Sequence, residues 1–285
     1  LSLGVPGPLT KEGVVERFPN IPGFENFDLK KVLQEKLEKR YGRAFPIYIQ
    51  NDVSAWARGE ATYWDTQRFI YLAIGIGLGG ALVSERGRSV ENIEPGWIVK
   101  IDNKPLEELT AARYLINRVR ERIRKGEQTN VLRFTEKSDI RNLAIDAISE
   151  AAEKQDELAL SVVRESAAHL GSGIVYLAKK YNIKDFVIGG IISKMGEIYL
   201  SAIREQVKKE MPEFDTSRIR QSRSKTAIMG AAGIVPSFLK SSSPIINRND
   251  ENTSRKRILF VDDEEPIRGI GRQLLERAGY AVEIA

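Results

Sequence analysis

The amino-acid sequence predicts an α/β protein, with enough residues for one large domain or two of middle size. Three observations support this class. The chain has 285 residues, of which 42% are hydrophobic and 29% charged, the usual balance of a globular protein. Short apolar runs alternate along the chain with segments of helical spacing. Several of the predicted strands end in glycine turns, as at Gly77 and Gly189.

The first predicted elements lie between residues 1 and 60. Residues 1–9 are rich in Gly and Pro and indicate the end of a buried strand that enters a turn. Residues 28–39 carry apolar side chains at helical spacing with charges between them, which predicts an amphipathic helix. Residues 45–50 predict a strand, and a helix is expected to begin near Val53.

The middle of the chain predicts a hairpin followed by helices. Residues 69–76 and 81–84 are apolar strands that flank a glycine turn. Residues 111–125 predict a basic helix with five arginines and one lysine against one glutamate. Residues 139–180 keep small and apolar side chains at spacings of three and four, which predicts a long helical region.

The last elements repeat the strand-then-helix order. Residues 185–188 predict a strand that ends at two glycines, and residues 195–209 predict a helix. Residues 225–238 predict a further helix crowded with small residues. Residues 240–254 are polar and turn-rich, which is typical of a linker.

Composition excludes several classes of site. The chain has no cysteine, so it has neither a disulfide framework nor a thiolate nucleophile nor a zinc site built on Cys. Its single histidine, His169, excludes a site of several histidines and is expected to pack structurally on its helix. The apolar runs are short and broken by glycine and no signal peptide is visible, so we expect a cytoplasmic protein without a membrane partner. Because the chain starts at Leu1 and stops at Ala285, we expect it to be part of a longer protein.

The glycine-rich segment YLAIGIGLGGALV, residues 71–83, is the most informative block. Glycines let backbone amides approach a bound anion closely, because no Cβ intervenes. A strand rather than a helix follows, so this is not a dinucleotide fingerprint, and no Gly-Lys-Ser/Thr is present. The alternative interpretation is a hairpin that packs against neighbouring backbone.

Asp52 stands at the end of a predicted strand, where α/β sheets place their ligands. A carboxylate there can accept a proton from a substrate hydroxyl as a general base. The alternative, favoured by position alone, is that Asn51 or Asp52 caps the following helix. Gly189 and Gly190 lie between a strand and a helix, which suits a phosphate or ribose or, equally, tight helix–sheet packing.

Six segments in one order give this chain a family resemblance. Residues 1–239 resemble the ROK family of sugar kinases and sugar-responsive repressors, which belongs to the actin-like ATPase superfamily. The matching segments are GVPGPL (4–9), PNIPGFEN (19–26), QNDVSAWARGE (50–60), IYLAIGIGLGGALV (70–83), the stretch 145–190 that ends in VIGG, and IMGAAG (228–233).

The resemblance implies a two-lobed, ribonuclease-H-like α/β fold that binds a sugar, ATP and Mg²⁺, with the N-terminal lobe incomplete in this chain. It implies that Asp52 is the base for a sugar hydroxyl. A homodimer is left open. The implied sugar-binding residues are Asn51, Asp52 and Glu94, and the implied nucleotide- and phosphate-binding residues are Gly77, Gly79, Gly80, Gly189 and Gly190.

Several departures from the family pattern predict a weakened kinase. The family's first phosphate loop would precede Leu1, and Ile76 stands where a threonine is usual. Trp97 replaces a histidine in EPGW, and the Cys-rich zinc segment that should follow is deleted, so no zinc is expected. We expect Trp97 to fill the vacated space rather than to stack on a sugar. Ile191 replaces a third glycine.

Residues 255–285 resemble the opening of a response-regulator receiver domain, a flavodoxin-like fold. Its expected elements are a strand at 258–261, a helix at 266–278 and a strand at 280–284. Asp262 and Asp263 follow the first strand, as Mg²⁺ ligands of a receiver would; the alternative is an acidic turn that caps the helix. About 30 residues bury no core of their own, so we expect this truncated fragment to be poorly ordered and unable to accept phosphate.

Three functions follow from these patterns. The first is a ROK-type sugar-binding module that is weakened as a kinase and fused to a receiver domain, whose partner would be a histidine kinase. The second is an ATP-dependent hexose or N-acetylhexosamine kinase with Asp52 as base. The third is a ROK repressor whose DNA-binding unit precedes Leu1. The arginine-rich helix is expected to be a solvated face and not itself a nucleic-acid site, because Tyr114 is its one aromatic residue.

Overall fold

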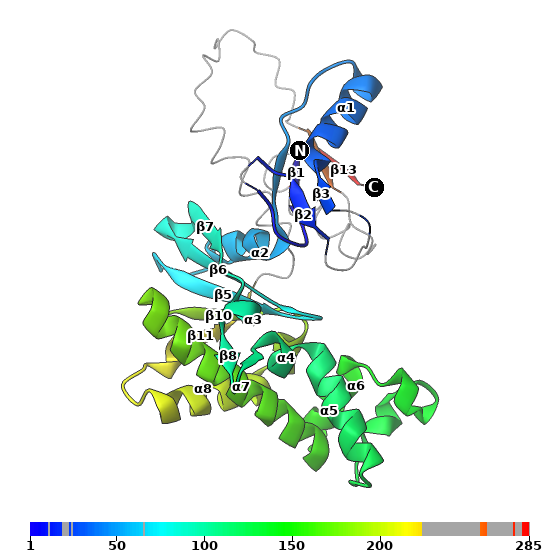
Figure 1. The fold of residues 1–285 in the computed structure, drawn as a ribbon, viewed down its shortest axis with the longest axis vertical. Coiled ribbons are helices and arrows are strands. Elements are labelled where there is room, and N and C mark those ends of the chain that lie inside the picture. Colours follow the sequence, from blue (N-terminus) through cyan, green and yellow to red (C-terminus); the bar gives the residue numbers. More distant parts are fainter. Residues whose placement is uncertain are drawn as a thin grey trace. The chain divides into compact units, whose positions relative to one another are not determined.

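A computed structural model of the chain describes residues 1–10, 12–18, 23, 25–64, 66–223, 257–260, 276 and 281–284 (Figure 1). The chain divides into two compact units. Unit 1 is Leu1–Tyr63 together with Ser224–Ala285, and unit 2 is Trp64–Arg223. Three predicted features lie outside the described residues: the helix at 225–238, the linker at 240–254 and the acidic pair Asp262 and Asp263.

The described residues of unit 1 form short strand pairs and two α-helices. β1 (Ser2–Val5) pairs in parallel with β4 (Tyr48–Asn51), and the register places Gly4 opposite Gln50. β2 (Val15–Arg17) and β3 (Glu25–Phe27) form an antiparallel pair. The expected strand at 45–50 is therefore real, but it begins later and runs up to Asn51.

The two helices of unit 1 have clear end signals. α1 (Leu29–Tyr41) starts after Asp28, whose Oδ1 accepts a hydrogen bond of 2.9 Å from the Lys31 N–H. It ends at Gly42, which has the left-handed φ of 68° that favours glycine. α2 (Asp52–Glu60) follows β4 without a loop.

The sheet of unit 2 mixes parallel and antiparallel strands in the order β11-β10-β5-β6-β7. β5 pairs in parallel with β10, which pairs in parallel with β11, whereas β5, β6 and β7 are antiparallel. This arrangement agrees with the ribonuclease-H-like lobe that the family resemblance implies. The strands are β5 (Phe69–Ile74), β6 (Leu78–Ser84), β7 (Ser89–Asn92), β10 (Phe186–Gly189) and β11 (Ile219–Gln221).

Helices of unit 2 are separate elements where the sequence suggested one long region. Residues 139–180 contain two α-helices, because Gln155 adopts a φ of 60° and Asp156 caps the second of them by accepting the Ala159 N–H at 2.9 Å. The α-helices are α3 (Pro95–Ile98), α4 (Glu107–Thr110), α5 (Ala112–Arg124), α6 (Ile145–Glu153), α7 (Glu157–Tyr181) and α8 (Glu197–Glu210). Short 3₁₀ turns are η1 (Glu85–Gly87), η2 (Val131–Phe134), η3 (Glu136–Ser138), η4 (Ile140–Asn142), η5 (Ile192–Met195) and η6 (Thr216–Arg218).

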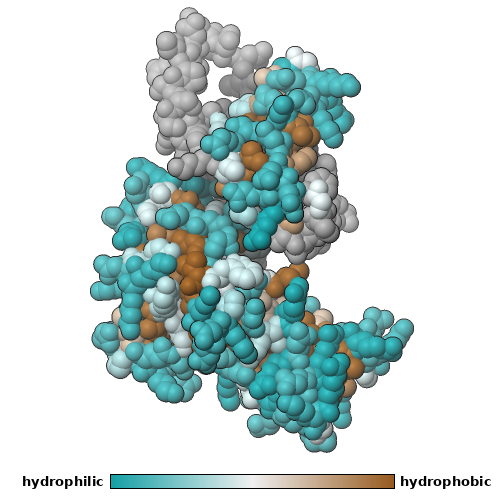
Figure 2. All heavy atoms as spheres, viewed as in Figure 1, coloured by the Kyte–Doolittle hydropathy of each residue, from teal (hydrophilic) through white to brown (hydrophobic). Residues whose placement is uncertain are grey.

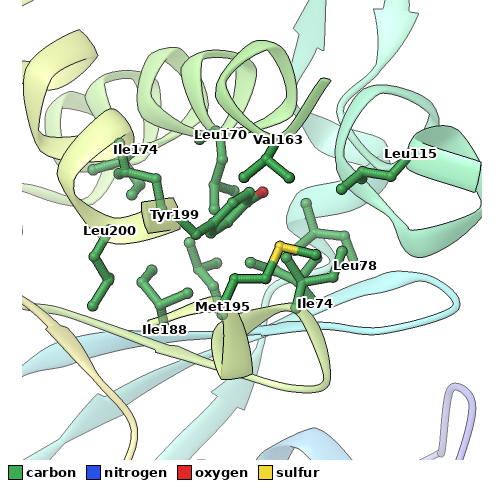
Figure 3. Close-up of a cluster of buried hydrophobic side chains, with 14 of the residues drawn as sticks. Ile74, Leu78, Leu115, Val163, Leu170, Ile174, Ile188, Met195, Tyr199 and Leu200 are labelled. Atoms are coloured by element: carbon green, nitrogen blue, oxygen red, sulfur yellow. The ribbon is translucent and has the colours of Figure 1, made fainter. Parts of the chain in front are cut away.

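The core of unit 2 lies between its sheet and the packed pair α7 and α8 (Figure 3). Ile74 and Ile188 project from the sheet toward Leu170 of α7, and Tyr199 of α8 lies between them. Tyr199 is fully buried, and its hydroxyl is 3.1 Å from the hydroxyl of Ser166. Burial raises the pKa of Tyr199, so the phenol stays neutral. Each such buried side chain stabilises the unit by about 1.5–3 kcal/mol.

An aromatic and charged cluster joins the first and last residues of unit 2. The guanidinium carbons of Arg220 and Arg223 lie 5.0 and 4.4 Å from the ring centre of Trp64. Arg220 also lies 3.4 Å from Oδ1 of Asp185, which is buried. Thr66 donates to the other oxygen of Asp185 at 3.4 Å. The entering and leaving segments of unit 2 are therefore fastened to each other.

The C-terminal residues of the described chain form a further parallel pair. β12 (Arg257–Phe260) pairs with β13 (Ala281–Ile284), close to the strands expected at 258–261 and 280–284. Among the described helices, none combines the length and the apolar composition that a membrane crossing demands.

Candidate functional site

The junction of β4 and α2 holds Asn51 and Asp52. Asn51 caps α2, because its Oδ1 accepts a hydrogen bond of 3.1 Å from the Ser54 N–H. Its side-chain amide also donates to the Gly7 carbonyl at 3.1 Å. One oxygen of Asp52 accepts the Val53 N–H at 2.8 Å. The capping interpretation is therefore confirmed for Asn51, and Asp52 occupies the first turn of the helix.

The start of α2 packs close to Gly4 of β1. A Cβ at Gly4 would lie 3.4 Å from the Cα of Asp52 and 3.5 Å from the Cβ of Ala55. These are ordinary van der Waals distances, so the strand and the first turn of α2 are neighbours in the fold.

The glycine turn joins β5 to β6 through three residues. The last strand pair is Ile74 with Leu78, and the Gly75 N–H donates to the Gly77 carbonyl at 2.9 Å. Strand β6 is longer than expected and includes Gly79 and Gly80. Ile76 stands at the tip with its side chain 67% exposed. An apolar side chain therefore stands where the family resemblance places a hydroxyl.

Residues at the start of α4 and α5 hold this turn in place. The Leu78 N–H donates to Oε2 of Glu107 at 2.8 Å, and the Ala112 N–H donates to the Gly75 carbonyl at 2.8 Å. Glu107 was not singled out from the sequence. The signal available was an acidic residue at the start of a helix next to the deletion, and only the fold shows that this helix contacts the glycine turn.

Protein atoms occupy the space that side chains would need at Gly77 and Gly80. A Cβ at Gly77 would lie 2.7 Å from Oε2 of Glu107, and one at Gly80 would lie 2.6 Å from Cγ of Pro95. Gly79 pairs with Ala73 in the strand ladder. Packing against the Pro95 ring thus explains Gly80 without any ligand, whereas at Gly77 the close atoms belong to the end of the flexible Glu107 side chain.

Packing also explains the second glycine turn. A Cβ at Gly189 would overlap the hydroxyl of Tyr71 and lie 2.5 Å from its Cζ. Gly190 has a φ of 83°, and its Cβ would overlap the backbone of Ile74. Close packing between the neighbouring strands β10 and β5 therefore accounts for both residues, whereas the alternative considered from the sequence was packing between a helix and the sheet.

Glu94 lies between β7 and α3 in a left-handed conformation, with φ 42° and ψ 53°. Its Oε1 accepts a hydrogen bond of 2.8 Å from the side-chain amide of Asn92, and its own N–H donates to Oδ1 of Asn92 at 3.4 Å. Two residues later, a Cβ at Gly96 would lie 3.0 Å from the Cβ of Glu107. Glu94 and Glu107 therefore belong to neighbouring segments.

A tight hairpin occupies the segment where the family resemblance implies that a metal-binding stretch is missing. β8 (Lys100–Ile101) and β9 (Lys104–Pro105) are antiparallel, and the two residues between them, Asp102 and Asn103, have φ values of 49° and 63°. These values are typical of a type I′ turn. The expectation that Trp97 fills a vacated space is wrong, because Trp97 is 51% exposed.

The single histidine and the arginine-rich helix form a polar surface cluster. The rings of His169 and Tyr114 meet edge to face at 6.2 Å, and Tyr114 donates to Glu165 at 2.7 Å. Arg118 also donates to Glu165, at 3.2 Å. Burial lowers the pKa of His169. Figure 2 shows hydrophilic residues over most of the visible surface around α5, in agreement with a solvated face.

The described residues contain no group of three or more His, Cys, Asp or Glu side chains that could hold a metal ion. Asn51 and Asp52 belong to unit 1, whereas Glu94 and the glycine turns belong to unit 2. Within unit 2 the fold brings together the glycine turn, Glu107 and the Glu94 segment. The assigned roles in binding sugar and nucleotide remain predictions.

Comparison with known proteins gives a family match over most of the chain. The model of the ROK family matches residues 1–88 and 107–237. The match is interrupted at 89–106, the segment that contains Glu94 and Trp97, and it resumes at the glutamate that contacts the glycine turn.

Relatives of two kinds are similar to this chain. It is 24% identical over 262 residues to the xylose repressor of Caldicellulosiruptor bescii, covering 85% of this chain and 63% of the repressor. It is 28% identical over 262 residues to the glucokinase of Thermotoga maritima, covering 82% of this chain and 78% of the glucokinase. Its fold is similar to that of a ROK family glucokinase from Streptomyces griseus, with a TM-score of 0.68, 23% identity and coverage of 82% and 80%. The chain therefore spans less than two thirds of the repressor.

Proposed function

Because the chain belongs to the ROK family, whose model matches residues 1–88 and 107–237, we propose that it is a sugar-binding module in which phosphoryl transfer is weakened or lost. Its fold is the mixed α/β fold of ROK sugar kinases. The relatives include both kinases and repressors, so membership of the family leaves the activity open.

The proposed sugar contacts are Asn51, Asp52 and Glu94. Carboxylate oxygens accept hydrogen bonds from sugar hydroxyls, and an amide can donate and accept. Asp52 lies in the first turn of α2, where one of its oxygens accepts the Val53 N–H. The Streptomyces griseus relative was solved with glucose and AMPPNP, which supports a sugar and a nucleotide as the ligands to test here.

The observation that carries the proposal of a weakened kinase is Ile76. Phosphoryl transfer depends mainly on positioning and on neutralising charge at the phosphates. At the tip of the glycine turn, this chain presents an exposed isoleucine, which can neither donate a hydrogen bond nor neutralise charge. Protein packing explains Gly80, Gly189 and Gly190, so their presence adds little support for a nucleotide site.

Where ATP and Mg²⁺ do bind, they would supply the phosphoryl group and its charge neutralisation. The glycine turn, with Gly77, Gly79 and Gly80, would face the phosphates, and Gly189 and Gly190 would lie near the adenosine. The family domain is proposed to span residues 1–239.

The test is a binding titration over hexoses, pentoses and acetylhexosamines, read by tryptophan fluorescence and by calorimetry. A coupled assay for ADP release runs on the same samples with ATP and Mg²⁺. Saturable sugar binding without ADP release is expected. Ile76→Thr restores the family's hydroxyl, and we expect it to tighten nucleotide binding while sugar binding stays unchanged. Sugar-dependent ADP release by the native chain would contradict a lost activity.

The alternative is an ATP-dependent hexose or N-acetylhexosamine kinase with Asp52 as the base. Its support is the retention of Asp52 at the start of α2 and the similarity to glucokinases. The native chain would have to turn over ATP in the presence of sugar, and Asp52→Asn would have to abolish this turnover while its sugar affinity stays within about threefold of the native value. That result would establish the kinase activity. A repressor whose DNA-binding unit precedes Leu1 is a further alternative, which the similarity to the xylose repressor supports.

We also propose that residues 255–285 form the opening part of a receiver domain, after a linker at 240–254. The parallel pairing of β12 with β13 supports this, because parallel strands need a crossover connection and residues 261–280 are long enough to supply one. Manganese should broaden the amide resonances of Asp262 and Asp263 in the labelled chain. Equal broadening in Asp262→Ala would contradict the proposal. In a longer chain, the partner would be a histidine kinase.

A further inference from the structure

We infer that Asn92 is a positioning residue for Glu94: its side-chain amide orients the Glu94 carboxylate toward a bound sugar. This inference rests on the proposed sugar-binding function. It concerns a segment that has Trp97 and no cysteine or histidine near Glu94. The side-chain amide of Asn92 is the group that contacts the carboxylate here.

The backbone alone does not hold the Glu94 side chain. Glu94 has a φ of 42°, a conformation that most residues adopt only at a cost of about 1–2 kcal/mol. Its carbonyl accepts the Trp97 N–H at 3.1 Å and so begins α3, but that bond leaves the side-chain torsions free. A flexible carboxylate would lose conformational entropy when it binds a sugar, which weakens affinity.

Asn92 supplies the missing restraint from a rigid position. It is half-buried on β7 and pairs with Ala81 of β6. The following Ile93 is buried, and its N–H donates to the Gly80 carbonyl at 3.0 Å. The amide that contacts Glu94 therefore projects from a fixed strand, two residues before the carboxylate.

The two hydrogen bonds act in opposite directions between the same residues. The amide of Asn92 donates to Oε1 of Glu94 at 2.8 Å, and the N–H of Glu94 donates back to Oδ1 of Asn92 at 3.4 Å. The first bond is charge-assisted and short enough to be strong. It leaves Oε2 of Glu94 available to accept a sugar hydroxyl. An amide suits this role because it donates without adding charge, whereas a carboxylate at position 92 would repel Glu94.

Binding measurements on three variants test the role of Asn92. We expect Asn92→Ala to weaken sugar affinity about tenfold, in line with the loss of one hydrogen bond to a charged group. Asn92→Asp should weaken it more at neutral pH and recover part of it in acid, since a shared proton restores a donor between the two carboxyls. A purely structural role would not create this pH dependence. Asn117→Ala, an exposed position on α5, is the matched control and should bind as the native chain does.

A sugar-independent readout accompanies the titrations. In the ¹H–¹⁵N spectrum of the sugar-free chain, Glu94→Gln should shift the side-chain amide signals of Asn92. Native affinity in Asn92→Ala, or unmoved signals in Glu94→Gln, would overturn the inference while the proposed function stands. Absence of sugar binding by the native chain would overturn the proposed function and this inference together.

Discussion

Replacing the second glycine turn by alanines tests whether packing or ligand binding requires glycine there. At Gly190 two costs combine. A non-glycine residue at a φ of 83° costs about 1–2 kcal/mol, and overlap with the Ile74 backbone adds about 1–3 kcal/mol of overpacking. At Gly189 the backbone conformation is ordinary, so only the overlap with the buried Tyr71 ring remains, about 1–3 kcal/mol.

Urea unfolding followed by far-UV circular dichroism measures these costs without any ligand. We expect Gly190→Ala to lower the free energy of unfolding by about 2–5 kcal/mol and Gly189→Ala by about 1–3 kcal/mol. With a urea dependence of about 1–3 kcal/mol/M, the midpoints should fall by about 0.5–2 M. Gly75→Ala is the matched control, because nothing lies within 4 Å of its added Cβ, and its midpoint should stay unchanged.

The opposite interpretation makes a different prediction. If these glycines serve only the close approach of a nucleotide, alanine would leave the midpoints at the native value and would weaken nucleotide binding alone. Native midpoints for both variants would therefore refute the packing argument. A partial rescue of Gly189→Ala by Tyr71→Phe would support it, since removing the hydroxyl removes one of the overlapping atoms.

Three further predictions concern other parts of unit 2. Burial holds the pKa of His169 below 6.5, so as the pH falls the unfolded chain takes up a proton before the folded chain does. The free energy of unfolding should therefore decline as the pH falls below about 6.5. In His169→Gln, the urea midpoints should lack this part of the decline. Asn103→Val should lower the melting temperature by several degrees because φ there is 63°, whereas Asn103→Gly should leave it equal or higher. Trp64→Ala should speed hydrogen exchange at 66–68 and 219–223, and Trp64→Phe, which keeps a ring for the two arginines, should restore most of the protection.

Sequence reasoning located the strands and helices that have strong local signals. The helix after Asp28 and the hairpin around Gly77 have clear apolar patterns and clear end signals, and both are present. The observed ends of strands differ from the predicted ends where pairing with a neighbouring strand sets them. Strand β6 begins at Leu78 rather than at Ala81, because its partner β5 continues to Ile74. The hairpin at residues 100–105 was missed, because two-residue strands carry no periodic pattern.

The candidate site shows the same division. Asn51 and Asp52 stand out in the sequence because a polar pair ends an apolar strand, but only the hydrogen bonds identify Asn51 as the cap. The glycine pattern suggested a ligand, whereas contacts with Glu107 and Tyr71 show that neighbouring side chains fill the space. Asn92 and Glu107 were not singled out, because the strand geometry that brings Asn92 to Glu94 and the fold that brings Glu107 to the glycine turn are not written in local patterns.

By itself, the sequence determined the α/β class and the family, because both depend on the order of short local patterns along the chain. It also determined that no cysteine-based metal site exists, because composition alone decides that. Only the tertiary structure decided which glycines are required by packing, how a hairpin closes the deleted segment, and which amide orients Glu94. Those properties depend on atoms that are distant in sequence or on backbone angles, and local sequence patterns do not encode either.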